Sequence, residues 1–205
     1  MFDPLSLPPP VPARPAAEGF LLLLPAPSPP FGPRCARLHA AGVRALVSLL
    51  PRSEARALGI DLAALARACA ALGIAWWHAP IPDFAAPDAA FERRWRTRAP
   101  LLRDLLRARA GVALHCRAGL GRSGTIAARL LVELGIAPEE AIARVRASRP
   151  GAIETAAQEA RVLARARLRP ARDAGREGAE RGREEASQAG EEKKRPRGAD
   201  RWRRP

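Results

Sequence analysis

The chain has 205 residues, with 35 Lys or Arg against 21 Asp or Glu, so its formal net charge at pH 7 is +14. An apolar fraction of 47% is sufficient for the core of one ordinary domain with tails. The longest apolar run, residues 20–24, is much shorter than the ~18 residues of a membrane span. The proline-interrupted start does not resemble a secretory signal, and we expect a cytoplasmic protein without a membrane span.

The three cysteines are Cys35, Cys69 and Cys116, an odd number with no C-x-x-C spacing. This pattern argues against a disulfide framework and against a zinc site. We therefore expect free thiols in a reducing compartment and no bound metal or other cofactor.

The positive charge is unevenly distributed along the chain. Residues 170–205 carry 11 basic and 8 acidic side chains, so most of the excess lies in residues 1–169. Every basic residue except Lys193 and Lys194 is arginine, within a composition rich in Ala, Leu, Pro and Gly that resembles a genome-wide bias. Because few aromatic residues are interleaved with the basic ones, nucleic acid is not the expected partner.

Both ends of the chain differ in composition from the middle. Eleven of the first 33 residues are proline, which predicts an extended segment over residues 1–18 and ordered structure only from about Phe20. Residues 170–205 contain one large apolar side chain, Trp202, and are expected to be a disordered charged tail. The remaining residues, 19–169, are expected to form one domain, and we expect the protein to be a monomer.

Within this domain, short apolar runs alternate with helical patterns. Buried strands are predicted at residues 20–24, 43–49, 75–79 and 112–115. One helix is predicted to begin after Asp61, which acts as its N-cap. Four further helices are predicted at residues 88–110, 122–134, 138–148 and 155–168. The alternation predicts an α/β domain with a central, mainly parallel sheet of about four to five strands and helices on both faces. Ligands of such sheets bind at the carboxyl ends of the strands.

The most informative segment follows the strand at residues 112–115. The strand leads to Cys116, a glycine-rich loop follows, and Arg122 opens an amphipathic helix. Glycines allow such a loop to turn successive N–H groups inward, and the helix adds the positive end of its dipole. The loop is therefore expected to bind a phosphate group and to keep Cys116 as a nucleophilic thiolate.

Arginine at position 122 suits this loop because a guanidinium can hold two phosphoryl oxygens at once. Ser123 places a hydroxyl near the sulfur, where it can stabilise the thiolate when sulfur becomes the leaving group. The residues expected to bind substrate are Arg117, Ala118, Gly119, Leu120, Gly121 and Arg122. We expect His115 to support the loop by hydrogen bonding, and Arg117 to be either surface charge or a selector for acidic substrates.

The segment from His115 to Thr125 resembles the signature of the cysteine-dependent protein tyrosine phosphatases. It is most similar to their compact dual-specificity group, including Cdc14-like and kinase-associated-phosphatase-like members. This resemblance implies a dual-specificity phosphatase fold and a two-step reaction through phosphocysteine, without a metal. Leu120 stands where lipid-specific relatives carry a second loop lysine, and the lack of tyrosine removes the aromatic tyrosine-binding loop of the larger phosphatases.

Two further segments carry candidate groups. Asp83 follows Pro82 on a proline-rich loop, 33 residues before Cys116, and the resemblance implies that it is the general acid. Asp88 is the rival acid, although its position fits an N-cap better. The segment from Arg149 to Gln158 resembles the late loop of the dual-specificity group, which implies that Gln158 positions the hydrolytic water. Glu154 and Thr155 are interpreted as capping groups.

The sequence therefore favours a phosphatase that acts on phosphorylated proteins. Two alternatives remain open at this point. The substrate could be a small-molecule or lipid phosphate, or the domain could be a catalytically idle adaptor that binds phosphate without turnover.

Overall fold

The computed structural model describes residues 7–13 and 19–164. The tail predicted at residues 170–205 and most of the N-terminal segment lie outside the described residues. Within the described ranges, no helix combines the length and apolar character that crossing a bilayer requires.

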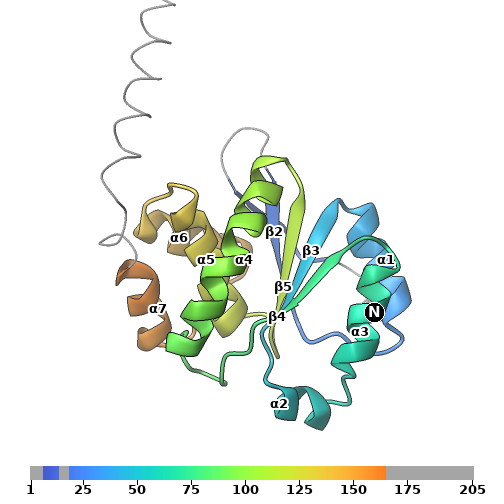
Figure 1. Cartoon of the computed structure of the whole chain (residues 1–205). Coiled ribbons are helices and arrows are strands. Elements are labelled where there is room, and N and C mark those ends of the chain that lie inside the picture. Colours follow the sequence, from blue (N-terminus) through green and yellow to red (C-terminus); the bar gives the residue numbers. More distant parts are fainter. Residues whose placement is uncertain (1–6, 14–18, 165–205) are drawn as a thin grey trace, which may run out of the picture. The chain divides into compact units, whose positions relative to one another are not determined.

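The core of the domain is a five-stranded sheet in the order β1-β2-β5-β3-β4 (Figure 1). β2, β5, β3 and β4 are parallel to their neighbours, and only β1 is antiparallel, which confirms the mainly parallel sheet. β5 lies in the centre, where all five of its residues are buried. The strands are β1 (Val11–Pro12), β2 (Phe20–Leu24), β3 (Val43–Ser48), β4 (Ala75–His78) and β5 (Gly111–His115).

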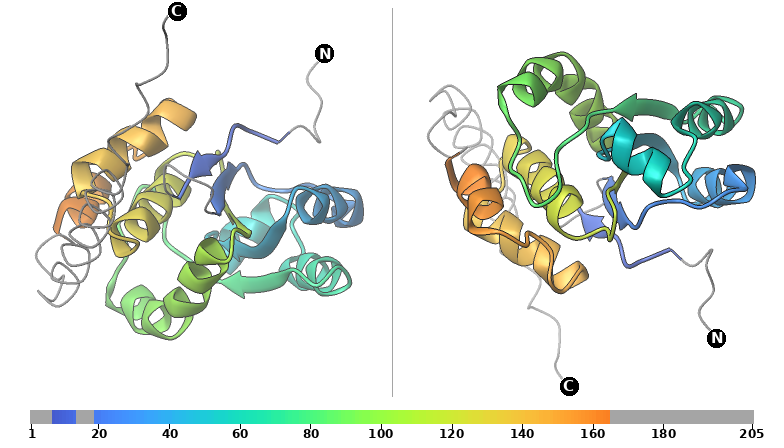
Figure 2. Two further views of the ribbon diagram at one scale, coloured as in Figure 1. Left: turned by 90° about the horizontal axis from the view of Figure 1, so that it is seen from above. Right: turned by 90° about the horizontal axis from the view of Figure 1, so that it is seen from below.

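Helices cover both faces of the sheet, as predicted. One hydrophobic cluster joins the sheet to α1 and α3, and a second, larger cluster joins it to α4, α5, α6 and α7 (Figure 1). α2 lies at the carboxyl ends of the strands, the end viewed in the right-hand panel of Figure 2. The helices are α1 (Phe31–Ala40), α2 (Arg52–Ala57), α3 (Leu62–Ala70), α4 (Ala89–Arg107), α5 (Gly121–Glu133), α6 (Pro138–Ser148) and α7 (Ala156–Leu163).

Two predicted helix starts are confirmed by their capping bonds. The Asp61 carboxylate accepts hydrogen bonds from the backbone N–H groups of Ala63 and Ala64, at 2.8 and 3.0 Å. The Asp88 carboxylate accepts one from the N–H of Phe91 at 2.7 Å. Each carboxylate satisfies donors that the first turn of a helix leaves unpaired, and its charge suits the positive end of the helix dipole.

Three elements were not predicted. β1 pairs with β2, and Val11 is fully buried, so the expectation that order begins only near Phe20 is wrong for residues 7–13. Pro12 is tolerated because β1 is an edge strand, where a missing N–H costs no ladder bond. α1 contains Gly32 and Pro33 in its first turn, where proline removes no intrahelical bond. α2 is too short to show a helical period.

A buried charge network connects the helices that follow the site loops. Arg129 of α5 pairs with Glu92 of α4 at 2.8 Å and with Glu133 at 2.9 Å. Its guanidinium also lies 4.6 Å from the centre of the Trp95 ring, and Arg161 of α7 reaches Glu92 at 2.9 Å. Because each buried charge has partners, the network can hold α4, α5 and α7 in fixed relative positions.

Candidate active site

The loop between β5 and α5 turns at a glycine with a left-handed backbone. Gly119 has a φ of 75°, in the left-handed region. A Cβ at this position would lie 2.7 Å from the Leu24 carbonyl carbon, so no other residue fits without a backbone shift. The N–H of Ala26 donates to the carbonyl of Arg117 at 3.0 Å and fixes the loop to the segment after β2.

Cys116 begins this loop, and its side chain is buried. Its Sγ lies 3.4 Å from the Ser123 hydroxyl, within hydrogen-bond distance for sulfur. Ser123 belongs to the first turn of α5, and no side chain caps the N-terminus of this helix. The sulfur and the hydroxyl are therefore adjacent, as the sequence predicts.

Arg122 lies in the first turn of α5 with its side chain 2% exposed, and it contacts two acidic residues from other segments. Its Nη1 and Nη2 atoms donate to the two carboxylate oxygens of Glu54 at 2.6 and 2.9 Å. Nη2 also lies 2.8 Å from Oδ1 of Asp83. The structure therefore brings Asp83 and Arg122 into direct contact, although 39 positions separate them in the sequence.

The electrostatics of Arg122 favour its charged form. Burial alone lowers the pKa of the guanidinium, but the hydrogen bonds and charge of Glu54, with the charges of Cys116 and Asp83, raise it above its ordinary value. A permanently charged guanidinium at this position can stabilise negative charge on a bound oxyanion.

Glu54 is the site residue that the sequence analysis missed. It lies on α2, the short helix that follows β3. β3, β4 and β5 are parallel, so the loops that follow them meet at one edge of the sheet. An acidic residue soon after β3, at the same edge as Asp83 and Cys116, was the available signal.

We expect the Glu54→Gln substitution to lower kcat/KM by roughly 10- to 100-fold, because Arg122 loses the charged partner that fixes its orientation, and small misplacements of catalytic groups are costly. Steady-state hydrolysis of p-nitrophenyl phosphate measures this effect. Glu140→Gln is the matched control, since Glu140 pairs with Arg144 on the exposed surface of α6. Equal activity of the two variants would show that Glu54 does not position Arg122.

His115 ends β5 and is fully enclosed. Its Nε2 lies 2.6 Å from the hydroxyl of Ser48 on β3. That hydroxyl also accepts a hydrogen bond from the indole N–H of Trp76 at 2.8 Å. Burial lowers the pKa of His115 to about 3, and contact with the Cys116 backbone acts in the opposite direction. The imidazole is therefore neutral at pH 7, and it supports the strand end rather than carrying a proton.

This burial predicts a dependence of stability on pH. The unfolded chain protonates His115 below its ordinary pKa of 6.5, whereas the folded chain does not until about 3. The free energy of unfolding should therefore fall as the pH drops through this window, by about 1.4 kcal/mol per pH unit. Urea unfolding at several pH values tests this, with the shallower slope of a His115→Gln variant as the expected contrast. An identical slope in both proteins would contradict the assignment.

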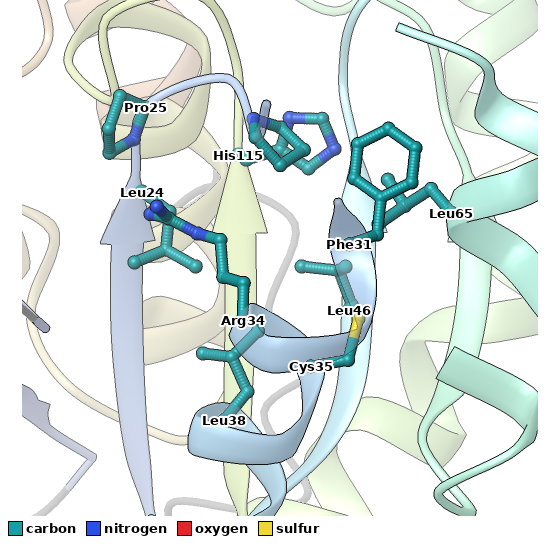
Figure 3. Close-up of a pocket in the computed structure, with 10 residues that line it drawn as sticks. Leu24, Pro25, Phe31, Arg34, Cys35, Leu38, Leu46, Leu65 and His115 are labelled. Atoms are coloured by element: carbon teal, nitrogen blue, oxygen red, sulfur yellow. The ribbon is translucent and has the colours of Figure 1, made fainter. Parts of the chain in front are cut away.

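A narrow pocket beside His115 is too small for a substrate. It lies between β2, β5 and α1, is lined mainly by apolar side chains, and encloses about 10 Å³, room for a single water (Figure 3). Cys35 lines it, with its Sγ 3.7 Å from that of Cys69. Both are free buried thiols, as predicted, in the hydrophobic cluster that does not contain Cys116.

Gln158 is buried at the start of α7 and connects two site loops. Its Oε1 accepts hydrogen bonds from the N–H groups of Glu154 and Thr155 at 2.9 and 3.3 Å, and its Nε2 donates to the carbonyl of Ala85 at 3.3 Å. Thr155 caps the helix reciprocally, as predicted. A Cβ on Gly121 would lie 3.0 Å from Gln158 Oε1. The amide therefore lies against the loop from Cys116 to Arg122, which we call the phosphate loop.

The remaining loop residues differ in exposure. Arg117 is exposed and Leu120 is half-buried. The carbonyl of Ala118 accepts a hydrogen bond from Arg149 at 3.1 Å, which connects the loop to the segment before α7. Across residues 7–13 and 19–164, no three His, Cys, Asp or Glu side chains gather in an arrangement that could hold a metal ion.

Comparison with known proteins decides the family. Residues 24–136 match the family described as Tc-R-P, polymorphic toxin system, DSP-PTPase phosphatase, and this match spans more than half of the chain. The chain belongs to this family. The match contains Glu54, Asp83, Cys116, Arg122 and Ser123, whereas Gln158 lies beyond it.

Solved structures agree with this assignment. The phosphatase is similar to the kinase associated phosphatase, which was solved with its catalytic-site cysteine replaced by serine. The two are 26% identical, the match covers 79% of this chain and 94% of the other, and the TM-score is 0.64. It is also similar to the active form of Tk-PTP, with 28% identity, 80% and 99% coverage and a TM-score of 0.57. PTPMT1, solved in complex with PI(5)P, shares the fold at 21% identity, 70% and 87% coverage and a TM-score of 0.55.

Proposed function

We propose that this phosphatase hydrolyses phosphate monoesters on proteins through a phosphocysteine intermediate at Cys116. The observation that supports it most strongly is the contact between Arg122 and Asp83, 2.8 Å apart, at the end of the loop that Cys116 begins. An anion-binding group, an acid and a nucleophile are thereby available to one phosphoryl group.

In the first step, the Cys116 sulfur attacks phosphorus as the bond to the leaving oxygen breaks. Arg122 and the loop amides hold the equatorial oxygens, and Asp83 transfers its proton to the departing oxygen. Asp83 Oδ1 lies 2.8 Å from Nη2 of Arg122 in this structure. A phosphoryl oxygen that replaces Asp83 at the guanidinium would release the carboxyl group toward the leaving group.

In the second step, a water attacks phosphorus and the sulfur leaves as thiolate. Asp83, now ionised, removes the proton from the water. Gln158 lies against Gly121 and against Ala85, which is two residues after Asp83. In this position its amide can orient that water. The Ser123 hydroxyl, 3.4 Å from the sulfur, can donate a hydrogen bond to the departing thiolate.

Two observations support a phosphoprotein substrate. The first is the similarity to the kinase associated phosphatase, with a TM-score of 0.64. The second is Leu120, whose side chain supplies no charge that could bind a second phosphate on the ring of a phosphoinositide. The alternative, a lipid or small-molecule phosphate, draws support from PTPMT1, which was solved with PI(5)P. From the family description we also infer that the phosphatase is the enzymatic part of a polymorphic toxin system.

The test is a comparison of substrates with the purified full chain. We expect hydrolysis of p-nitrophenyl phosphate, and higher kcat/KM for phosphotyrosyl or phosphothreonyl peptides than for phosphoinositides in vesicles. A preference for the phosphoinositides would favour the lipid alternative. Binding of phosphopeptides without any phosphate release would identify an adaptor and contradict the proposal.

A further inference from the structure

A group of arginines near the site lacks carboxylate partners. Arg52 and Arg56 on α2 and Arg94 on α4 are exposed, and none of them forms an ion pair within the described ranges. We call these three residues the arginine patch. By contrast, Arg103 and Arg107, further along α4, each pair with an acidic residue. Arg93, Arg96 and Arg98 on α4, and Arg109 and Arg117 elsewhere in the described ranges, are also exposed without an ion pair, so the patch is distinguished by its position near β4 rather than by its lack of partners.

Two of the patch residues share a helix with a site residue. Arg52 and Arg56 stand two positions before and after Glu54, whose carboxylate holds Arg122, and they occupy the other side of α2. Arg52 and Arg94 both act on His78, the last residue of β4: burial lowers the pKa of this imidazole most, and the two positive charges lower it further. Arg52 and Arg94 therefore both lie near the carboxyl end of β4, the strand that leads into the loop with Asp83.

A surface hollow extends the patch away from Arg122. It encloses about 420 Å³ and is lined by Arg52, Arg56 and the start of α3, which includes Asp61. The Asp61 carboxylate is already occupied, because it caps α3 and lies 3.9 Å from Arg67. The two arginines thus supply the free charge at the hollow.

We propose that the arginine patch binds acidic residues next to the phosphorylated residue of a protein substrate, so that the phosphatase prefers phosphorylation sites in acidic sequences. This inference rests on the proposed function. A peptide segment fits because its acidic side chains can reach both helices while the phosphorylated side chain enters the phosphate loop. The two helices thereby determine substrate specificity outside the loop.

Other polyanions fit this surface less well. The exposed large apolar side chains in the described ranges are Leu58, Phe84 and Leu101, one on each of three separate segments, so they form no continuous apolar face for insertion into a membrane. RNA single strands bind through exposed aromatic rings as well as charge. Trp76 and Trp77 are half-buried against neighbouring side chains, which leaves Phe84 as the exposed ring near the site.

The test uses two phosphotyrosyl peptides that differ only in flanking residues, glutamate in one and glutamine in the other. We expect kcat/KM to be about 5- to 30-fold higher for the glutamate peptide, mainly through KM, as two surface ion pairs would give. Raising the salt from about 0.05 M to about 0.5 M should shrink this ratio. In the Arg52→Gln/Arg94→Gln variant the ratio should fall to about 1 while hydrolysis of p-nitrophenyl phosphate is unchanged.

Arg109→Gln is the matched control, because Arg109 is an exposed arginine before the start of β5, at the opposite end of the sheet. It should keep the full preference. Equal rates on both peptides, or a preference that survives in the double variant, would overturn the inference. So would a higher kcat/KM on phosphoinositide vesicles or on 5′-phosphorylated RNA that depends on the same arginines.

Failure of this inference can be separated from failure of the proposed function. Calorimetric binding of the two peptides to a Cys116→Ser variant needs no turnover, and it should show the same preference for the glutamate peptide. If the unmodified chain does not hydrolyse p-nitrophenyl phosphate, the proposed function is contradicted, whereas the inference about the arginine patch is not. Equal binding of the two peptides would overturn the inference alone.

Discussion

The Cys116→Ser variant is expected to release phosphate from p-nitrophenyl phosphate at least about 10⁴-fold more slowly than the unmodified chain, because loss of a nucleophile removes the covalent route. The substitution changes one atom of a buried side chain, and the loop keeps Gly119, its bond to Ala26 and Arg122. Phosphate binding should therefore survive. The measurements are steady-state kinetics and calorimetric titration with inorganic phosphate.

Cys69→Ser is the control for this substitution. Cys69 is equally buried but belongs to the other hydrophobic cluster, and its thiol faces Cys35. Burial raises the pKa of Cys69 to about 12, so it holds its proton at neutral pH. We expect Cys69→Ser to retain activity per folded molecule. Residual activity of Cys116→Ser within tenfold of the unmodified chain would refute the nucleophile assignment.

The Asp83→Ala variant is expected to lose about 10²- to 10⁴-fold in kcat on substrates with poor leaving groups, which is the usual contribution of a positioned general acid. The loss should be smaller for p-nitrophenyl phosphate, because p-nitrophenolate leaves readily without a proton. The measurement is a series of aryl phosphates whose leaving groups span a wide range of basicity. The variant should show a steeper dependence of rate on that basicity.

Asp88→Asn separates the two candidate acids. Asp88 caps α4 through the N–H of Phe91, and asparagine caps helices about as well as aspartate. This variant should keep nearly full activity across the series. A loss in Asp88→Asn that grows with leaving-group basicity would transfer the acid role to Asp88. Equal losses for good and poor leaving groups in Asp83→Ala would also refute the assignment.

The phosphate loop could be predicted from sequence because its determinants are local. A buried strand, a cysteine, glycines and a helix start lie within about a dozen consecutive residues, and each has a direct backbone reason. The same holds for the caps at Asp61 and Asp88, whose partners lie within three positions. β2, β3, β4 and β5 were predicted within one residue at each end because their residues are mainly apolar.

The missed features depend on contacts between distant segments. Glu54 reaches Arg122 across 68 positions, and its place soon after β3 indicates the edge of the sheet but not the partner. β1 is a two-residue strand that forms only because β2 offers a free edge. The arginine patch was hidden in a chain with arginine throughout, and only the fold shows that Arg52 and Arg94 both lie close enough to His78 to affect its pKa.

The central claim is that one sulfur exchanges a covalent bond with phosphorus, and the Asp83→Ala variant allows this to be observed. Since Asp83 also serves as the base of the second step, phosphocysteine should accumulate when this variant is mixed with p-nitrophenyl phosphate and quenched with acid. Mass spectrometry should then find the mass of one added phosphoryl group, mapped to the peptide with Cys116. Steady turnover without any such adduct, or an adduct on a different residue, would contradict the account.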